Sequence, residues 1–561
     1  MHVLFICPRF PDSLWNFKGI NALAGVGSAQ SPIGLATIAA LTPPEISISL
    51  VDENLEPIDY DRDCDVVAIS CFNVQWARAV EIAAEFRGRG RLVVIGGPYP
   101  TLCPERFDGV ADVVFVGEAE YTWPRFCRDL LAGRPPARVY EQARGEVKLA
   151  DSPVPRYDLL PAGKYLYYYV QTTRGCPFQC EFCDIIVTDG RVPRTKTVDQ
   201  VMAEIETLHR LGARYVSFSD ANLIANPKYA QRLLAGLRDF GVRNGFPIRF
   251  AAELTLNVVE FPKILELMRD SNFESVFIGV ESPHPASLIE TKKQQNVRGS
   301  LLENIRTVQS YNLMVIAGMI VGFDGDDVGI FQDTFDFLQE AGIPFTTAGV
   351  LFAIEKTPLY ARLEREGRLL AYDATTVQVH GSADLNFRPQ QMSAEDLLGG
   401  YRWMVRALYR YDHYGERLVR AMQQFAPSPE AARRARKVLS GKNLAMTARI
   451  FAHFLLTRDG PRRRFFLQTL WRVMRESPSM QKLVVTVSFM TVHKHFHEYV
   501  RRIHGDPETT GPDSPFATRE GRALGAEPAP TRAPRSVAAH GAPGRPRQAW
   551  LAPAEWPEPR R

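Results

Sequence analysis

The chain has 561 residues, which is too long for one hydrophobic core and predicts about three domains. Its 45% hydrophobic and 23% charged residues are typical of a globular protein, and a net charge of +4 gives no indication of nucleic-acid binding. No basic segment followed by an apolar one opens the chain, and no apolar run reaches about 18 residues, so we expect a cytoplasmic protein without a membrane span.

Residues 1–140 alternate short apolar runs with amphipathic stretches, which indicates a parallel sheet doubly wound with helices in the Rossmann-like manner. Ligands of such sheets bind beyond the carboxyl ends of the strands. The segments there are rich in Gly and Pro, which favours close approach of the backbone to a large flat ligand; the alternative is that they are only tight turns. The expected strands are 2–7, 47–51, 65–70, 91–96 and 112–116.

A proline-containing linker, 141–164, precedes a second series of strands and helices in 165–375. Six such units predict a partial (β/α)6 barrel of the TIM type, with polar residues at the carboxyl ends of its strands. Residues 376–504 have a helical pattern, and 505–561 are rich in Pro, Ala and Arg, so we expect a helical domain and a disordered tail. The expected barrel strands are 165–172, 215–219, 248–253, 275–280, 314–321 and 346–352.

Three of the eight cysteines, Cys176, Cys180 and Cys183, lie close together just beyond an apolar strand, and the other five lie in or near apolar stretches, as buried thiols do. Thiolates are the usual ligands of iron–sulfur clusters. Three thiolates leave one iron of a [4Fe-4S] cluster open to a small molecule, as in catalytic metal sites that keep an open position. The alternatives are a zinc site, a closed electron-transfer cluster or unrelated core cysteines.

The Cys-x3-Cys-x-aromatic-Cys pattern, with Phe182 as the aromatic residue, resembles the signature of the radical S-adenosylmethionine (SAM) superfamily. The resemblance implies that SAM binds the open iron and is cleaved reductively to a 5′-deoxyadenosyl radical. It also implies SAM contacts at Asp220 and Asn222 for the amino group, at Glu253, Gly279 and Glu281 for the ribose and carboxylate, and at Gly322 for the adenine.

The order of domains, with the segments 31–35, 50–54, 96–101, 116–120 and 155–160, is similar to cobalamin-binding radical SAM enzymes over roughly residues 1–500, and most similar to the branch of hopanoid C-2 methylases. Because His2 is the only histidine before His209, the Asp-x-His-x-x-Gly loop that ligates cobalt in other cobalamin proteins is missing. The lower face of cobalamin would then face water or another residue. The resemblance implies cobalamin contacts at Gly96, Gly97, Thr101 and Glu118.

The implied reaction is cobalamin-dependent methyl transfer to an unactivated carbon of a lipid, a tetrapyrrole or a secondary metabolite. A reductant such as flavodoxin or ferredoxin would supply electrons. Two alternatives stay open: a cobalamin-dependent radical cyclisation or rearrangement, and a cobalamin-responsive binding module without catalysis.

The stretch 462–475 is basic and amphipathic, which favours peripheral contact with an anionic inner membrane. The alternative is a helix that packs on the barrel with a solvated basic face. His493 and His497 share a helical face and could bind a metal, or they are ordinary polar residues beside an apolar run.

Overall fold

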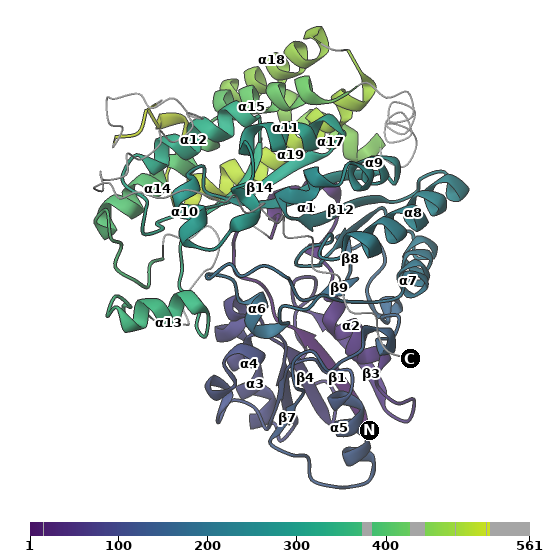
Figure 1. Ribbon diagram of the computed structural model, residues 1–561. Coiled ribbons are helices and arrows are strands. Elements are labelled where there is room, and N and C mark those ends of the chain that lie inside the picture. Colours follow the sequence, from purple (N-terminus) through teal and green to yellow (C-terminus); the bar gives the residue numbers. More distant parts are fainter. Residues whose placement is uncertain (15, 373–383, 427–443, 477, 512, 516–561) are drawn as a thin grey trace, which may run out of the picture. The chain divides into compact units, whose positions relative to one another are not determined.

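The computed structural model describes residues 1–14, 16–372, 384–426, 444–476, 478–511 and 513–515. In these residues two parallel sheets and a helical region follow one another along the chain (Figure 1). The strands expected in the first domain are confirmed, and one more is added at the sheet edge. In spatial order the six strands are β3 (Ser47–Asp52), β1 (His2–Cys7), β4 (Val66–Ser70), β5 (Leu92–Gly96), β6 (Val113–Val116) and β7 (Val139–Glu141).

Helices cover both faces of this first sheet. Leu4 and Ile6 of β1 belong to a core on one face, and Val3 and Phe5 belong to a separate core on the other. Because successive side chains of a strand point to opposite faces, this alternation confirms the doubly wound arrangement. One core is closed by α3 (Trp76–Gly88) and α4 (Pro98–Leu102), and the other by α2 (Ile33–Ala40) and α5 (Thr122–Leu131).

The second sheet is the predicted partial barrel, with helices that follow its strands (Figure 1). Its seven strands are all parallel, in the order β15-β14-β13-β12-β11-β8-β2. The barrel strands are β8 (Tyr165–Val170), β11 (Tyr215–Phe218), β12 (Arg249–Leu254), β13 (Phe273–Glu281), β14 (Met314–Val321) and β15 (Phe345–Val350). The helices are α6 (Ile185–Thr188), α7 (Val198–Arg210), α8 (Pro227–Asn244), α9 (Pro262–Asp270), α10 (Pro285–Glu290), α11 (Leu301–Ser310), α12 (Ile330–Ala341) and α13 (Pro358–Arg365).

The edge strand of the barrel sheet, β2 (Ser28–Gln30), comes from the N-terminal part of the chain. It pairs in parallel with β8, and Ser28 lies opposite Tyr165. The assignment of all of 1–140 to the first domain is therefore corrected at this strand. The segment has only three residues and no apolar run, so its pairing depends on a long-range contact and not on a local pattern.

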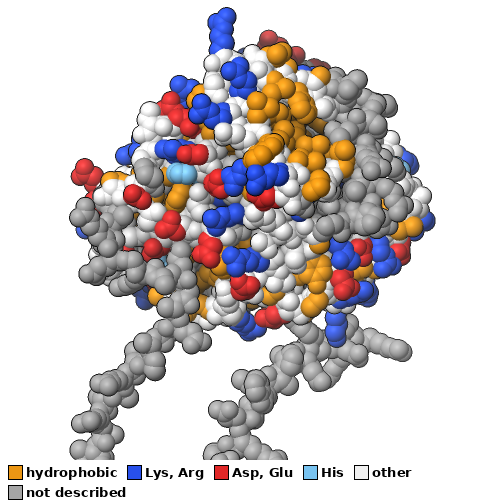
Figure 2. Space-filling model, turned by 90° about the horizontal axis from the view of Figure 1, so that it is seen from above, with side chains coloured by type: hydrophobic (Ala, Val, Ile, Leu, Met, Phe, Trp, Pro, Cys, Tyr) orange, Lys and Arg blue, Asp and Glu red, His pale blue; other side chains and the backbone are white. Residues whose placement is uncertain are grey.

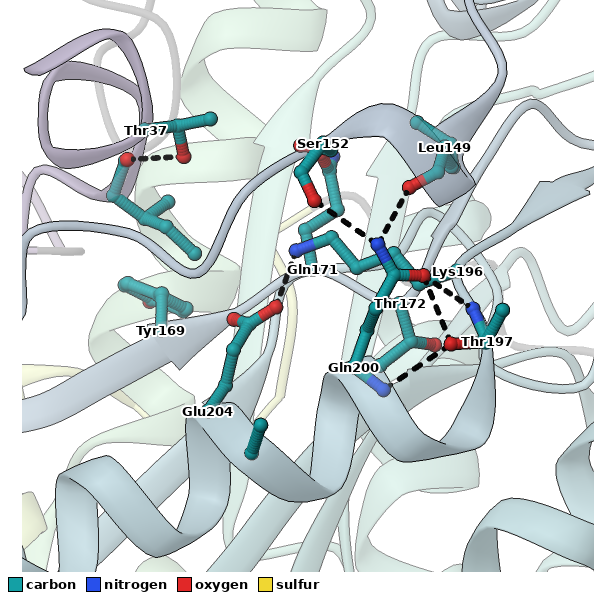
Figure 3. A network of polar contacts seen from close by, with 12 residues as sticks. Thr37, Leu149, Ser152, Tyr169, Gln171, Thr172, Lys196, Thr197, Gln200 and Glu204 are labelled. Atoms are coloured by element: carbon teal, nitrogen blue, oxygen red, sulfur yellow. Dashed lines mark hydrogen bonds and ion pairs between the residues drawn. The ribbon is translucent and has the colours of Figure 1, made fainter. Parts of the chain in front are cut away.

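The segment predicted as a linker, 141–164, is fixed to the start of α7 (Figure 3). Gln200 Nε2 donates a hydrogen bond to the carbonyl oxygen of Ser152 at 3.0 Å. Nearby, Lys196 Nζ lies 2.5 Å from Glu204 Oε1, and both side chains are buried. The Gln200 bond holds the segment between the two sheets against the barrel.

The region after the barrel is helical, as predicted. Arg417 is fully buried and joins this region to α12, because its Nη1 donates to Gln339 Oε1 at 2.9 Å. The N-terminal helix α1 (Lys18–Ala24) also packs here, since a Cβ on Gly19 would lie 2.9 Å from the Cα of His495. The helices are α14 (Ala394–Leu408), α15 (Tyr411–Gln424), α17 (Leu444–Leu455), α18 (Gly460–Glu476) and α19 (Met480–Ile503).

The histidines of α19 are packing residues. His493 Nε2 lies 2.8 Å from the carbonyl oxygen of Tyr409, and His497 Nε2 lies 3.3 Å from Glu508 Oε1. In the part of the chain that the structure describes, no three His, Cys, Asp or Glu side chains are arranged to hold one metal ion. The contacts therefore favour the interpretation of these histidines as ordinary polar residues.

The start of the predicted tail packs on the helical region. Glu508 accepts a hydrogen bond from the amide of Tyr411 at 3.0 Å, and Asp506 caps the short 3-10 helix Pro507–Thr509. The domain boundary at 505 is therefore corrected to a later position, while residues 516–561 lie outside the described part of the chain. None of the helices described is long and apolar enough to cross a bilayer.

Candidate functional site

The three predicted metal ligands lie on one loop at the carboxyl end of β8. Strands β9 (Thr173–Arg174) and β10 (Arg194–Thr195) pair antiparallel at the base of this segment, which we call the cysteine loop (residues 175–193). Across the base, the amide of Cys176 donates to the carbonyl oxygen of Gly190 at 3.1 Å. The loop is thus a closed unit attached to the barrel at two adjacent points.

The thiols of the cysteine loop are free and shielded from solvent. Cys180 is 7% exposed, and Cys176 and Cys183 are half-buried. Burial raises the pKa of Cys183 to about 12 and that of Cys176 above its ordinary value. Gln295 Nε2 donates to Cys180 Sγ at 3.6 Å. A metal is therefore needed to hold Cys176 and Cys183 as thiolates.

The arrangement of donors distinguishes a cluster from a zinc site. A structural zinc ion needs four ligands that converge on one point, and the described residues include no three such side chains that do so. A [4Fe-4S] cluster binds each thiolate on a different iron, so its ligands need not converge. Three thiols on one loop therefore fit a cluster with one open iron, and the zinc alternative is not supported.

A buried ion pair lies beside the cysteine loop. Lys293 Nζ is 2.7 Å from Glu281 Oε1, and each side chain is 9% exposed. Burial alone would lower the pKa of Lys293, but the Glu281 carboxylate and the sulfur of Cys180 raise it above its ordinary value. The lysine is therefore charged, and a fixed positive charge near the thiols favours their thiolate form.

The backbone of β13 makes room for this ion pair. Glu281 has a backbone φ of 69°, which residues other than glycine rarely adopt. The pairing of β13 with β14 shifts register between Gly279 and Glu281. A Cβ on Gly279 would overlap Glu281 Oε1 and lie 2.9 Å from Lys293 Nζ. Glycine is therefore required at 279 so that the Glu281 carboxylate can fold back along its own strand.

Phe182, the aromatic residue of the cysteine pattern, and Gly322, predicted to contact the adenine of SAM, lie near each other. The centre of the Phe182 ring lies 6.0 Å from the centre of the Phe323 ring and 6.0 Å from Lys293 Nζ. Gly322 has a φ of 104°, and its amide donates to Asp326 Oδ2 at 2.9 Å. The structure thus brings the cysteine loop and the end of β14 together.

Asp220 and Asn222 are buried and engaged with protein groups. The Asp220 carboxylate accepts hydrogen bonds from the amides of Thr172 at 2.6 Å and Thr173 at 3.0 Å, and from the Thr172 hydroxyl at 2.5 Å. Asn222 Nδ2 donates to Thr255 Oγ1 at 3.1 Å. The Asp220 bonds hold the end of β8, where the cysteine loop begins, against β11, and the Asn222 bond ties the segment after β11 to the end of β12.

Glu253, at the end of β12, has a carboxyl group exposed on the concave face of the sheet. Although its surface is accessible to solvent, the protein around the barrel opening limits hydration of the carboxylate and, with a smaller effect of the Asp220 carboxylate, raises the pKa of Glu253 to about 7. Burial and, to a smaller extent, the Glu253 carboxylate raise the pKa of Tyr169, which is half-buried on the same sheet. The neighbouring Tyr168 points into the outer core. Glu253 is therefore a carboxyl group that faces the open side of the barrel and is available to a ligand.

The loops at the carboxyl ends of β5 and β6 present mainly backbone. Thr101 Oγ1 donates to the carbonyl oxygen of Gly97 at 2.8 Å and accepts from the amide of Gly117 at 3.0 Å, which ties the two loops together. Gly96 ends β5, and Gly97 has a φ of 111°. A Cβ at Gly97 would lie 3.1 Å from the backbone of the neighbouring β4 loop, so these glycines allow a close approach of the chain.

Glu118, predicted to contact cobalamin, binds two arginines of the cysteine-loop base. Glu118 Oε2 lies 2.8 Å from Arg174 Nη1, and Glu118 Oε1 lies 2.5 Å from Arg194 Nη2. Glu120 Oε1 lies 2.7 Å from Arg174 Nη2. Arg174, Arg194 and Lys293 are not predictable as site residues from the sequence, because a single basic residue carries no local signal about a partner far along the chain.

Three domain families match the chain, and they follow its architecture. A B12 binding domain matches residues 22–126, the Radical SAM superfamily matches 170–338, and a domain of unknown function matches 357–509.

Two relatives match most of the chain. An uncharacterized methyltransferase of Synechocystis sp. is 34% identical over 516 residues, which cover 90% of this chain and 94% of that protein. Hopanoid C-2 methylase of Rhodopseudomonas palustris is 35% identical over 377 residues, which cover 66% of this chain and 71% of that protein.

A solved structure shares the fold. The cobalamin-dependent S-adenosylmethionine radical enzyme OxsB, with aqua-cobalamin and S-adenosylmethionine bound, is similar with a TM-score of 0.55 at 14% identity. The similarity covers 89% of this chain and 80% of that one, so it includes both sheets and the helical region.

Proposed function

Because the chain belongs to the family of radical SAM enzymes with a B12-binding domain, to which hopanoid C-2 methylase also belongs, we propose that it methylates an unactivated carbon in a cobalamin-dependent reaction. The observation that carries the proposal is the cysteine loop, with three free thiols beside a buried Lys293–Glu281 pair. When bound, the [4Fe-4S] cluster supplies the electron that cleaves SAM, and cobalamin carries the methyl group.

In this proposal Cys176, Cys180 and Cys183 would each bind one iron and leave the fourth open to SAM. Lys293 would offset the negative charge of the thiolates.

SAM would lie along the carboxyl ends of β11 to β14. Glu253 is suited to accept hydrogen bonds from ribose hydroxyls, because its carboxyl group faces the open side of the barrel. Phe182, Gly279 and Gly322 would shape the pocket, since an aromatic ring and two positions without side chains admit a flat adenine close to the backbone. Asp220, Asn222 and Glu281 would act by holding these groups in place.

Cobalamin would lie against the backbone of Gly96, Gly97 and Thr101. The described front-domain residues after His2 contain no histidine, so this chain has no imidazole there for the lower face of cobalt. Recognition would then depend on shape and backbone hydrogen bonds.

As substrate we propose a lipid, a tetrapyrrole or a secondary metabolite. Two relatives are named for a hopanoid and for bacteriochlorophyllide d, which sets the range to be tested. Methyl-deuterated SAM offered with each candidate, with flavodoxin or ferredoxin as the reductant, should give a product heavier by one labelled methyl group. A product of unchanged carbon count would support cyclisation or rearrangement instead.

The cofactor content tests the proposal before any substrate is known. The protein is purified without oxygen after growth with iron, sulfide and cobalamin, and then examined by metal analysis and visible absorption. About four irons per chain and a corrinoid band are expected. Absence of corrinoid uptake would contradict the methyl-transfer proposal and leave the radical SAM chemistry in place.

We also propose peripheral contact with an anionic membrane through an exposed stripe of α18, here the α18 stripe (Arg463, Leu467, Trp471 and Arg475). These residues lie four apart and share one helical face. Leu467 is 51% and Trp471 59% exposed, and the Arg475 guanidinium lies 4.8 Å from the Trp471 ring. Figure 2 shows hydrophobic side chains beside Lys and Arg side chains on this side of the molecule. Arginines beside apolar side chains suit lipid phosphates above acyl chains.

Vesicle sedimentation tests this contact. The protein should bind vesicles of phosphatidylglycerol and phosphatidylcholine and not vesicles of phosphatidylcholine alone. Replacing Arg463 and Arg475 by Gln should weaken binding by about 2 kcal/mol, since each basic residue near an anionic surface contributes about 1 kcal/mol. Val242→Ala, which changes an apolar residue of α8 that is 66% exposed, is the matched control and should bind as the wild type does.

A further inference from the structure

We propose that Glu118 is a positioning residue, which fixes the cysteine loop relative to the cobalamin-binding domain and thereby sets the separation of the two cofactors. The inference rests on the proposed cluster and cobalamin sites. It gives Glu118 a role through two arginines and not through contact with cobalamin.

The contact joins both ends of the cysteine loop to one carboxylate. Arg174 and Arg194 are paired residues of β9 and β10, so they stand side by side at the loop base. Glu118 Oε2 accepts from Arg174 Nη1 and from Arg194 Nη1, each at 2.8 Å, and Glu118 Oε1 lies 2.5 Å from Arg194 Nη2. A planar guanidinium and a carboxylate bind in a narrow range of orientations, so the two pairs together restrict sliding of the base.

The contact is shielded from water. The side chains of Arg174 and Arg194 are each 14% exposed, and that of Glu118 is 11% exposed. Glu120 adds a second carboxylate to Arg174, and the guanidinium holds the pKa of Glu120 below its ordinary value although burial would raise it. Surface ion pairs are screened and contribute little, whereas a shielded network of two carboxylates and two guanidinium groups holds its geometry.

On one side the network continues directly into the cluster ligands. Only Gly175 separates Arg174 from Cys176, and its φ of 92° together with a Cβ position 2.9 Å from the carbonyl oxygen of Val192 leaves no room for a side chain. Arg194 Nη1 also donates to the carbonyl oxygen of Val147 at 3.0 Å. A displacement of Arg174 therefore displaces the first cysteine.

On the other side the network continues into the proposed cobalamin surface. Gly117 directly precedes Glu118, and its amide is held by Thr101 Oγ1, which in turn donates to the carbonyl oxygen of Gly97. Gly117 has a φ of 84°, and a Cβ there would lie 2.5 Å from the carbonyl oxygen of Gln142, so the loop has no freedom at this point. The cobalamin surface and the cluster ligands are thus linked through Glu118 by short, ordered contacts.

The separation of two cofactors matters because a displacement of about 1 Å between reacting groups lowers a rate by about a hundredfold. A carboxylate at the junction, bound to both ends of the cysteine loop, keeps this separation constant while the substrate enters between the sites. Glu118→Gln retains the size of the side chain and removes the charge that holds two guanidinium groups.

The separation can be measured without a substrate. The full chain is loaded with a cluster and with cobalamin, reduced to the paramagnetic cluster and cob(II)alamin, and examined by pulsed dipolar electron paramagnetic resonance. The wild type should give one narrow distance distribution. Glu118→Gln should keep its iron and corrinoid content and give a broader distribution with a shifted mean. An unchanged distribution in Glu118→Gln would overturn the inference.

Three further variants make the test specific. Arg194→Gln removes the same contact from the other side and should broaden the distribution as Glu118→Gln does, and the double variant should be no broader than either. Glu355→Gln is the matched control, because it breaks another ion pair between the two sheets, Arg106 to Glu355 at 2.5 Å, that does not touch the cysteine loop. It should leave the distribution narrow, and equal broadening would overturn the inference.

Failure of the inference differs from failure of the proposed function. Loss of corrinoid in Glu118→Gln alone would show that Glu118 contacts cobalamin and would overturn the positioning role. A wild-type protein that takes up no corrinoid would overturn the proposed function, and the inference with it.

Discussion

The cysteine loop and the strand-end loops of the first sheet, the two proposed cofactor sites, are built from different groups. The cysteine loop presents side chains, namely three thiols, with the ion pair of Lys293 and Glu281 beside them. The loops around Gly97 and Thr101 present backbone, and their side chains bond to neighbouring loops. Cofactor binding at the cysteine loop should therefore be lost when a single side chain is removed. Cofactor binding at the strand-end loops should instead be weakened by changes that alter the backbone conformation.

The largest effect is expected from replacing Cys176, Cys180 or Cys183 by Ala. Each change leaves a second iron without a protein ligand, so cluster content and reductive SAM cleavage should both be lost. Cobalamin uptake should persist, because the strand-end loops are unchanged. Iron analysis and chromatography of 5′-deoxyadenosine measure the two losses. Cys127→Ala, which removes a buried thiol of α5, should retain iron; a cluster retained in the loop variants would contradict the assignment.

Asp220→Asn should lower the free energy of unfolding by about 3 kcal/mol, because the charged acceptor of three buried hydrogen bonds becomes neutral and one of its oxygens becomes a donor. The asparagine oxygen can still accept from the Thr172 and Thr173 amides, which both donate to Asp220 Oδ1, but the new nitrogen replaces the oxygen that accepts from the Thr172 hydroxyl. Urea unfolding without oxygen measures the change. Asp239→Asn makes the same chemical change in a surface ion pair with Arg238, whose aspartate is 54% exposed, and should change stability by less than about 1 kcal/mol. Equal effects would contradict the positioning role of Asp220.

Gly97→Ala should weaken cobalamin binding about tenfold and leave iron content unchanged, since a side chain at positive φ costs about 1–3 kcal/mol and here also meets the β4 loop. The φ of 111° and the 3.1 Å approach to the Cys71 backbone are the causes. Equilibrium dialysis with hydroxocobalamin measures the affinity. Gly90 also has a positive φ, 73°, but it has open space around it and lies before the start of β5, away from the carboxyl ends of the strands. Gly90→Ala should therefore bind cobalamin normally.

The smallest effect concerns the pH dependence of stability and Glu253. Its pKa is raised from 4.5 to about 7 in the folded protein, so the folded state holds this proton more tightly than the unfolded chain. The stability linked to Glu253 is therefore fully present below pH 4.5 and is lost as the pH rises through 7. Glu253→Gln should remove this loss, so the variant gains stability relative to the wild type across that range. Thermal unfolding without SAM at a series of pH values measures the difference, and parallel curves would contradict it.

The sequence by itself determined the features that depend on neighbouring residues. The barrel strands and the doubly wound sheet follow from apolar runs of strand length, and the cysteine loop follows from the spacing of its thiols just after such a run. Such predictions hold in the fold because each apolar run or thiol spacing is set by a few neighbouring residues.

Only the tertiary structure decided which polar groups meet. It paired β2 with β8. It also formed the ion pairs of Glu118 with Arg174 and Arg194, and of Lys293 with Glu281. It also distinguished two strand-end carboxyl groups that look alike in sequence. The Asp220 carboxylate accepts hydrogen bonds from backbone amides, whereas the Glu253 carboxyl group faces the open side of the barrel. A charged side chain takes its partner from whatever the packing brings near it, and over long separations in the chain no local pattern records that choice.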